Sequence, residues 1–310
     1  MRHLGLILCL CLLIAACVRP IRSTLTGPMT PGKMAELWVQ PTGERDLFWG
    51  VGGQRLAPDP SITYQVISVK RDGFSGGLTV TGPDKRQWSA KFPPEASTEV
   101  VASRLLWGLG YHQPPIYYLP KWNADHAPTA NPQLPARFRE KKPDLYGLDD
   151  KGNWSYFENP FTETQEMHGL LVLQVMLGNS DLKDQQNVIY ELKDKYEGAT
   201  KWYVARDVGQ AFGRTGRMNP PRGDIKVWEE TPFIKGVGKN GIVEFEYHGR
   251  HHELVDGMTR ADVHWICEHL SRLTDHQWKD AFNAGGYSPE LADRFIRRFK
   301  QKIHEGLTIQ

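Results

Sequence analysis

Hydrophobic and polar residues alternate along part of the first half of the chain, which is the pattern of β-strands. Tyr64 to Arg71 and Gln87 to Phe92 alternate, and Leu78 to Thr81 forms a short β-rich run between them. A glycine-rich segment, Asp72 to Gly77, separates the first two strands, and Gly82-Pro83-Asp84 is a turn between the second and third. We therefore predict a three-stranded meander that carries a glycine loop.

Helical spacing replaces this alternation further along the chain. Ser97 is expected to cap a helix that ends at Gly110, with Glu99 in its first turn. Ile116 to Leu119 predicts one more strand, and Thr162 to Leu177 predicts an apolar core helix. The same periodicity predicts helices over the C-terminal segments 260–273, 275–284 and 289–306.

An acidic segment between the core helix and these last helices predicts a hairpin with carboxylates at its open end. Asp181 and Asn187 precede the strand VIYEL, and Asp207 follows the strand KWYVA. In an antiparallel hairpin, the start of the first strand lies beside the end of the second strand. The oxygens of these three residues are therefore expected to lie close together. That arrangement suits Mg²⁺ held against the phosphates of a nucleotide. The alternative is a solvated acidic hairpin.

Composition and charge narrow the class of protein. The chain has 310 residues, of which 40% are hydrophobic, so it can bury a sizeable core. Its net charge of +2 gives no electrostatic reason to expect a nucleic-acid partner.

The N-terminus has the pattern of an export signal. A basic start is followed by the apolar run Leu4 to Ala16, which is too short to span a bilayer, and then by Cys17. The end of this run resembles a bacterial lipobox, which predicts a lipoprotein signal peptide over residues 1–17 and a tether or linker over 18–63. Lipidation of Cys17 would anchor the exported protein to a bacterial cell membrane, inner or outer. The alternatives are a plain secretory signal or an uncleaved anchor helix. Cys267 lies among helix-spaced apolar residues and is expected to be a buried thiol.

Two motifs give the chain a family likeness. Gly178 to Asn187 and Asp207 to Gly213 resemble the G-N-x-D…N and D-x-G-x-x-F-G signatures of HipA-type and phosphoinositide-kinase-like proteins, and Lys91 to Tyr111 is similar to their N-lobe pattern. The resemblance implies an α+β, two-lobed, protein-kinase-like fold. Its parts would be a β-rich N-lobe over 64–120, an insertion or linker over 121–160, and a mainly helical C-lobe over 161–310.

The resemblance also implies roles for individual residues, with ATP and Mg²⁺ (or Mn²⁺) as cofactors. Asp181 would orient or deprotonate the attacking hydroxyl, and Lys183 would neutralise the transferred phosphate. Lys91 would contact the phosphates and Glu99 would hold Lys91. The remaining expected contacts are metal ligands at Asn187 and Asp207 and a phosphate cradle at Ser75, Gly76 and Gly77.

The sequence departs from the kinase pattern in two places. The glycine loop lacks the full G-x-G-x-x-G. The fifth residue after Asp181 is Gln186, and Asn187 follows one position later. Either the loop is one residue longer, or Gln186 replaces the usual asparagine ligand.

The expected function is Mg·ATP-dependent phosphoryl transfer to a hydroxyl-bearing substrate by an exported, lipid-anchored protein. The alternative is a catalytically inactive kinase-like scaffold of the cell envelope, and a third possibility is a cleft for another anionic ligand. Three segments are ambiguous. Gly236 to Gly241 matches G-x-G-x-x-G but is expected to be a hairpin turn. The histidines of 248–252 are expected to lie on a surface loop, and Arg214 to Arg222 is either a substrate-binding or a solvated segment.

Overall fold

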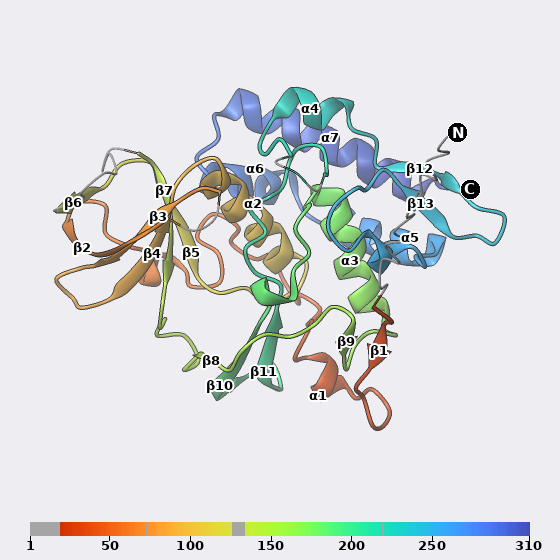
Figure 1. The fold of residues 1–310 in the computed structure, drawn as a ribbon, viewed down its shortest axis with the longest axis horizontal. Coiled ribbons are helices and arrows are strands. Elements are labelled where there is room, and N and C mark those ends of the chain that lie inside the picture. The colour runs from red at the N-terminus through yellow and green to blue at the C-terminus, as the bar shows by residue number, and fades with distance from the viewer. Residues whose placement is uncertain (1–18, 72–73, 126–133, 217, 219) are drawn as a thin grey trace, which may run out of the picture.

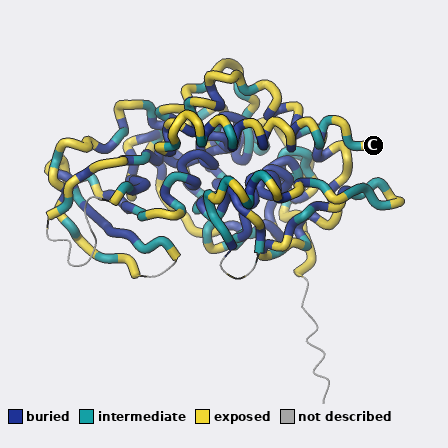
Figure 2. Tube along the Cα trace, turned by 90° about the horizontal axis from the view of Figure 1, so that it is seen from above, coloured by how far each residue is buried: buried dark blue, intermediate teal, exposed yellow. Residues whose placement is uncertain are grey.

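The structure, a computed structural model, describes residues 19–71, 74–125, 134–216, 218 and 220–310. The predicted signal segment, with Cys17, lies outside these residues. The chain forms a sheet-rich part and a helical part that lie side by side (Figure 1). Buried residues are gathered in the middle of the molecule, whereas the outer helices and loops carry most of the exposed ones (Figure 2).

A six-stranded sheet dominates the first part. Its strands are β2 (Thr63–Lys70), β3 (Gly77–Thr81), β4 (Gln87–Lys91), β5 (Ile116–Leu119), β6 (Asn123–Asp125) and β7 (Ala136–Glu140). Their order in space is β5-β7-β4-β3-β2-β6, so the predicted meander β2–β3–β4 lies inside the sheet. Every neighbouring pair is antiparallel except β2 and β6. This sheet and the following helix α2 are called the N-lobe.

Helix α2 (Glu95–Gly108) follows β4 and packs against β5 and β7. The expected cap at Ser97 is wrong, because the helix begins two residues earlier and Pro94 precedes it without a side-chain cap. Glu99 therefore lies in the second turn, where it is only 2% exposed. A glutamate that is buried this deeply must be stabilised by neighbouring positive charges, because the helix dipole alone is too weak.

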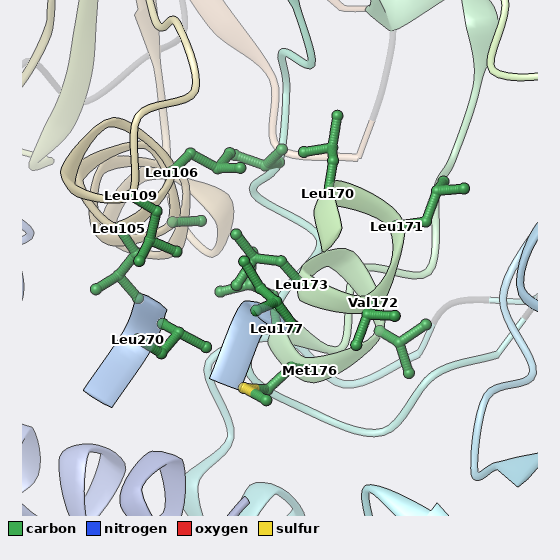
Figure 3. Packing of buried hydrophobic residues seen from close by; sticks show 14 of the residues in the cluster. Leu105, Leu106, Leu109, Leu170, Leu171, Val172, Leu173, Met176, Leu177 and Leu270 are labelled. Atoms are coloured by element: carbon green, nitrogen blue, oxygen red, sulfur yellow. The ribbon is translucent and has the colours of Figure 1, made fainter. Parts of the chain in front are cut away.

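Helices α3 (Gln165–Leu177), α4 (Ile225–Glu230), α5 (Arg260–Ser271), α6 (Asp275–Ala284) and α7 (Pro289–Leu307) form the C-lobe. Helix α3 is apolar on nearly every side and is buried against α5, which packs in turn on α7. Leucines of α3 meet those of α2 and α5 in one core (Figure 3). As predicted, α3 ends at Gly178, whose left-handed φ of 69° favours glycine.

The predicted acidic hairpin is present. It consists of β10 (Val188–Tyr196) and β11 (Ala199–Val204), and β8 (Asp149–Asp150) adds to β10. Val188 is paired with Val204, so the residues just outside these two lie together at the open end. A short 3₁₀ turn, Asp184–Gln186, leads into β10.

Two stretches expected to be linkers contribute to the fold. In the expected tether, β1 (Arg22–Ser23) pairs with β9 (Glu158–Asn159), and α1 (Pro31–Met34) is followed by the fully buried Leu37 and Leu47. In the expected insertion 121–160, β6 and β7 join the N-lobe sheet. Buried leucines in the first stretch and short strands in both therefore connect these segments to the rest of the fold.

The C-terminal expectations hold. Segment 236–241 joins β12 (Ile234–Val237) to β13 (Val243–Phe245) as a hairpin turn. Ser288 caps α7 by accepting a hydrogen bond from the Leu291 amide. Cys267 is a buried free thiol, and burial raises its pKa to about 12. No helix within the described ranges is long and apolar enough to cross a membrane.

Candidate functional site

A cavity of about 670 Å³ lies between the N-lobe sheet and the loops of the C-lobe. One wall is formed by β2, the glycine loop, β4 and β7 of the N-lobe. The facing wall is formed by the loops at the open end of the acidic hairpin. Seven of its lining residues are lysine or arginine, against four that are aspartate or glutamate. The excess of positive charge favours an anionic ligand.

Lys91 and Glu99 meet at this cavity, as expected for the pair. The Lys91 Nζ lies 2.7 Å from the Glu99 Oε2 and 3.3 Å from the Glu95 Oε2. Strand β4 supplies the lysine and α2 supplies both glutamates, so the contact fixes the helix against the sheet. The Asp207 Oδ1 is 3.8 Å from the same ammonium group, which brings a carboxylate from beyond the hairpin to the N-lobe.

Two arginines of β7 complete this cluster, and sequence reasoning missed both. The Arg137 Nε lies 3.0 Å from the Glu99 Oε1. The Arg139 Nη1 donates a 2.8 Å hydrogen bond to the Asp207 Oδ1 and lies 3.5 Å from the Glu99 Oε1. The alternating segment Ala136–Glu140 is a strand signal that would have found them, because its arginines share one face of the strand.

The charges of this cluster hold one another in the ionised state. Burial raises the pKa of the Asp207 carboxyl, but Arg139 and Lys91 outweigh burial and hold that pKa well below its usual range. Burial likewise works against Glu99, and Arg137 and Lys91 bring its pKa below the ordinary value. For Lys91, burial lowers the pKa, but Glu99 and Asp207 reverse the sign and raise it.

Asp207 also has an unusual backbone. Its φ of 57° lies in the left-handed region, which side chains other than glycine rarely adopt. Such strain persists only where the surroundings enforce it, and it is concentrated at functional sites. The conformation turns the chain sharply after β11, and the Asp207 carboxylate lines the cavity.

Asp181 faces the same cavity from the loop before the hairpin. Its Oδ2 accepts hydrogen bonds from the Lys183 Nζ at 2.7 Å and from the Gln186 Nε2 at 2.8 Å. The Arg250 Nε lies 3.4 Å from its Oδ1. Asp181 is therefore fixed in position on both oxygens, and Lys183 lies next to it at the cavity.

Asn187 does not line the cavity, which corrects its expected role as a metal ligand. Its side chain is 1% exposed and its Nδ2 donates to the Trp154 carbonyl oxygen at 3.3 Å. The 3₁₀ turn ends at Gln186, so Asn187 turns inward just before β10, and Gln186 takes the place in the cavity. The second alternative from the sequence, replacement by Gln186, fits the structure.

The expected phosphate cradle divides into two parts. Ser75 and Gly76 line the cavity, and the Ser75 Oγ is buried with no hydrogen-bond partner among the described residues. Gly77 belongs to β3 opposite Lys91, where a Cβ would collide with the Ala90 carbonyl oxygen. Gly77 is therefore required for close strand pairing, whereas Ser75 and Gly76 are free to face a ligand.

Arg222, from the segment after the hairpin, contacts both helix α2 and the glycine loop at the cavity. Its Nε lies 2.9 Å from the Glu95 Oε1, and its guanidinium lies 3.9 Å from the centroid of the Phe74 ring in the glycine loop. Arg214, from the same segment, is exposed and does not line the cavity, and Arg217 lies outside the described residues. The expected substrate-binding segment thus contributes one arginine to the described site.

The oxygen donors at the site fit a magnesium ion. The carboxylates of Asp181 and Asp207 and the amide of Gln186 all line the cavity. Mg²⁺ in proteins is held by one or two carboxylates together with substrate phosphates, so a larger cluster is not required. No group of three or more His, Cys, Asp or Glu residues placed to hold a metal occurs in the described part of the chain, the histidines of 248–252 included.

Comparison with known proteins finds similarity among solved structures only. No protein-family model matches the chain. No curated protein matches it. Among solved structures, the chain is similar to a crystal structure of a Helicobacter pylori proinflammatory kinase, CtkA, with a TM-score of 0.44 and 11% sequence identity, over 80% of this chain and 95% of that chain. The strands and helices described above make the fold α+β, with a β-rich N-lobe and a mainly helical C-lobe, as predicted.

Proposed function

We propose that this protein transfers a phosphoryl group from Mg·ATP to a hydroxyl-bearing substrate. One observation carries the proposal: the Lys91–Glu99 ion pair, Asp207 and Asp181 come from four separate segments and meet at one cavity. Phosphoryl transfer needs this set, in which a lysine held by a helix glutamate meets the phosphates and two acids hold the metal and the nucleophile.

The donor side of the cavity is formed by the N-lobe. Lys91 binds the phosphates of the nucleotide. The Ser75 Oγ, which has no hydrogen-bond partner among the described residues, and the Gly76 backbone lie on the same side of the cavity to meet them. Asp207 and Gln186 offer oxygen ligands for Mg²⁺. When bound, the metal neutralises the charge that develops on the transferred phosphate.

The acceptor side is formed by the loop before the hairpin. Asp181 accepts the proton of the substrate hydroxyl while that oxygen forms its bond to the terminal phosphorus, and the bond from phosphorus to the ADP oxygen breaks. Lys183, 2.7 Å from the Asp181 Oδ2, is placed to balance the negative charge of the phosphoryl group.

A second candidate function, an inactive binding module, is favoured by a different observation. Both acids already have cationic partners: Asp207 has Arg139 at 2.8 Å, and Asp181 has Lys183 at 2.7 Å. A catalytic site must exchange these partners for metal and substrate when the ligand enters. A scaffold would keep them.

Mg²⁺-dependent ATP binding and phosphate transfer test the proposal on the full chain. We expect the melting temperature to rise with ATP only when Mg²⁺ or Mn²⁺ is present, and labelled ATP to be hydrolysed or to label the protein. Asp207→Asn should abolish the metal-dependent shift, whereas Asp181→Asn should keep it and lose transfer by at least about a hundredfold.

Asp194→Asn is the matched control, because Asp194 is exposed on β10 and lines neither this cavity nor any other described one. It should leave both readouts unchanged. A metal-dependent shift without transfer in the unmodified protein indicates a module that binds the nucleotide but is inactive. The absence of any shift rejects phosphoryl transfer and selects the scaffold that keeps its cationic partners.

Export and lipid anchoring belong to the same proposal. Their support is the run Leu4 to Ala16 followed by Cys17. Labelling with a radioactive fatty acid in a bacterial host should mark the full chain and be lost in Cys17→Ser. Equal labelling of both proteins would contradict the anchor.

A further inference from the structure

A second cavity, of about 730 Å³, adjoins the candidate active site. The two cavities share Lys70, Ser89 and Arg139 in their walls. The rest of the second cavity comes from the turn before β4, from the residues that lead out of β7, and from side chains of the acidic hairpin. It therefore opens where the chain passes from the N-lobe to the C-lobe.

Positive charge dominates this second cavity. Seven of its lining residues are lysine or arginine and three are aspartate or glutamate. Glu140 is already held by Arg86 through hydrogen bonds of 2.9 and 2.7 Å. Asp150 lies 3.7 Å from Arg206. The acids of the cavity are too few to neutralise it.

The lysines of the second cavity are the positive charges that these acids do not neutralise. Lys70, Lys85, Lys141 and Lys142 line the cavity, and none has a carboxylate oxygen within 4.0 Å among the residues that the structure describes. The only hydrogen bond that the Lys70 side chain makes within those ranges goes to the Ser89 Oγ, at 3.2 Å. An ordinary exposed lysine faces bulk water, but these four converge on one hollow of the surface.

Two further observations indicate that the positive potential is unbalanced. Partial burial lowers the pKa of Lys70, and repulsion from Arg139, Arg137 and Lys141 lowers it further. The Arg206 Nε is buried without a hydrogen-bond acceptor among the described residues. A buried donor with no partner is costly unless a ligand or water satisfies it.

We propose that the second cavity binds a phosphate-bearing group, as an anion site beside the active site. Apart from Tyr190, every residue that lines it is polar or charged, and lysine and arginine side chains are suited to bind phosphate oxygens. Lysines in a hollow of this size suit a compact polyanion. The inference goes beyond the proposed function and does not depend on it, because the same charges line the cavity whether or not its neighbour transfers phosphate.

Inorganic tripolyphosphate is the probe that tests this site on the full chain, by isothermal titration. The variant Lys141→Ala/Lys142→Ala removes two exposed cations from the second cavity alone. We expect it to weaken tripolyphosphate binding about tenfold, as loss of charged hydrogen bonds does. The matched control is Lys121→Ala/Lys195→Ala, which removes two exposed lysines outside both cavities and should bind within about twofold of the unmodified protein.

Equal weakening by both double variants, or no binding by the unmodified protein, overturns the proposal. Mg·ATP binding read on Asp207→Asn tests the proposed function separately, so tripolyphosphate binding that survives a failure there leaves the anion site standing. A further arm identifies the source of the phosphate. Adenosine 3′,5′-bisphosphate binding about tenfold tighter than adenosine 5′-monophosphate, with the difference lost in Lys141→Ala/Lys142→Ala, indicates a phosphate carried by the nucleotide. Tripolyphosphate binding undiminished by saturating Mg·ATP indicates a separate ligand.

Discussion

Both lobes bury apolar side chains, but the N-lobe also buries a cluster of opposite charges beside the cavity. In the C-lobe, Leu173 of α3 is 0% exposed among other apolar groups (Figure 3). In the N-lobe, Glu99 is 2% and Arg137 is 1% exposed, and each touches an opposite charge. Burying a leucine stabilises the fold directly, whereas burying a charge costs free energy that its partner only partly returns. The apolar cores of both lobes therefore account for the stability of the fold, whereas the charged cluster depends on its own ion pairs and lies at the cavity.

Breaking the charged cluster at one residue should have the largest effect on stability. Glu99→Ala leaves Arg137 buried without its carboxylate, so we expect the free energy of unfolding to fall by about 3–5 kcal/mol. Urea unfolding measures the change. Leu173→Ala is the matched truncation in the other lobe and should cost about 3 kcal/mol through the cavity it leaves.

A double replacement separates stability from function in this comparison. Glu99→Leu with Arg137→Met replaces the ion pair by apolar groups and should recover most of the lost stability. It should not recover Mg·ATP binding, because Lys91 is left without Glu99. Recovery of nucleotide binding by the double variant would show that the cluster serves the fold alone.

The C-lobe contains an ion pair between the buried Asp262 and the partly buried His168, which gives the next largest effect. The His168 Nδ1 lies 2.9 Å from the Asp262 Oδ1, and Asp262 also caps α5 through Thr259. Burial raises the pKa of Asp262, but the hydrogen bonds from His168 and Thr259 lower it to about 2. The hydrogen bond to Asp262 raises the pKa of His168.

The signs of these shifts set the pH window. Asp262 stabilises the fold above its ordinary pKa of 3.8 and loses that effect as pH falls toward about 2. His168 stabilises it below its ordinary pKa of 6.5 and loses that effect as pH rises through the folded value. Asp262→Asn should therefore cost about 1–2 kcal/mol at pH 5.5 and less at pH 3. Urea unfolding at the two pH values checks this, and a loss that does not depend on pH would contradict the linkage.

Regular elements could be predicted from the sequence because their signals are local. Thr164 and Gly178 mark the ends of α3, and the alternating residues of β2 and β4 mark the meander. The sequence also predicted Lys91, Glu99, Asp181 and Asp207, each in or next to a strongly patterned element, and the structure places them around one cavity; their roles stay predictions.

The parts of the site that could not be predicted from the sequence depend on tertiary contacts. Arg137 and Arg139 lie on a five-residue strand whose alternation is a local signal, but only its pairing with β4 places the two arginines beside Glu99 and Asp207. The choice between Gln186 and Asn187 depends on where a 3₁₀ turn ends, and one residue changes which side chain faces inward. Pattern alone does not resolve a shift of that size.

The contact between the lobes at Arg222 should give the smallest effect. Its guanidinium joins Glu95 of α2 to Phe74 of the glycine loop, at 2.9 Å and 3.9 Å. Arg222→Ala should lower the free energy of unfolding by only about 0.5–1 kcal/mol, because Glu95 keeps Lys91 as a partner. We expect faster amide hydrogen exchange at residues 74–77, since the loop loses its anchor to the C-lobe.

Phe74→Leu is the control that separates the two contacts of Arg222. It removes the aromatic face but keeps an apolar side chain and the Glu95 ion pair, so exchange should rise at residues 74–77 and stay unchanged in the first turn of α2. Arg222→Ala should raise exchange in both places, because it releases Glu95 as well. Unchanged exchange at residues 74–77 in both variants would mean that the glycine loop is held by the sheet alone and that Arg222 does not anchor it.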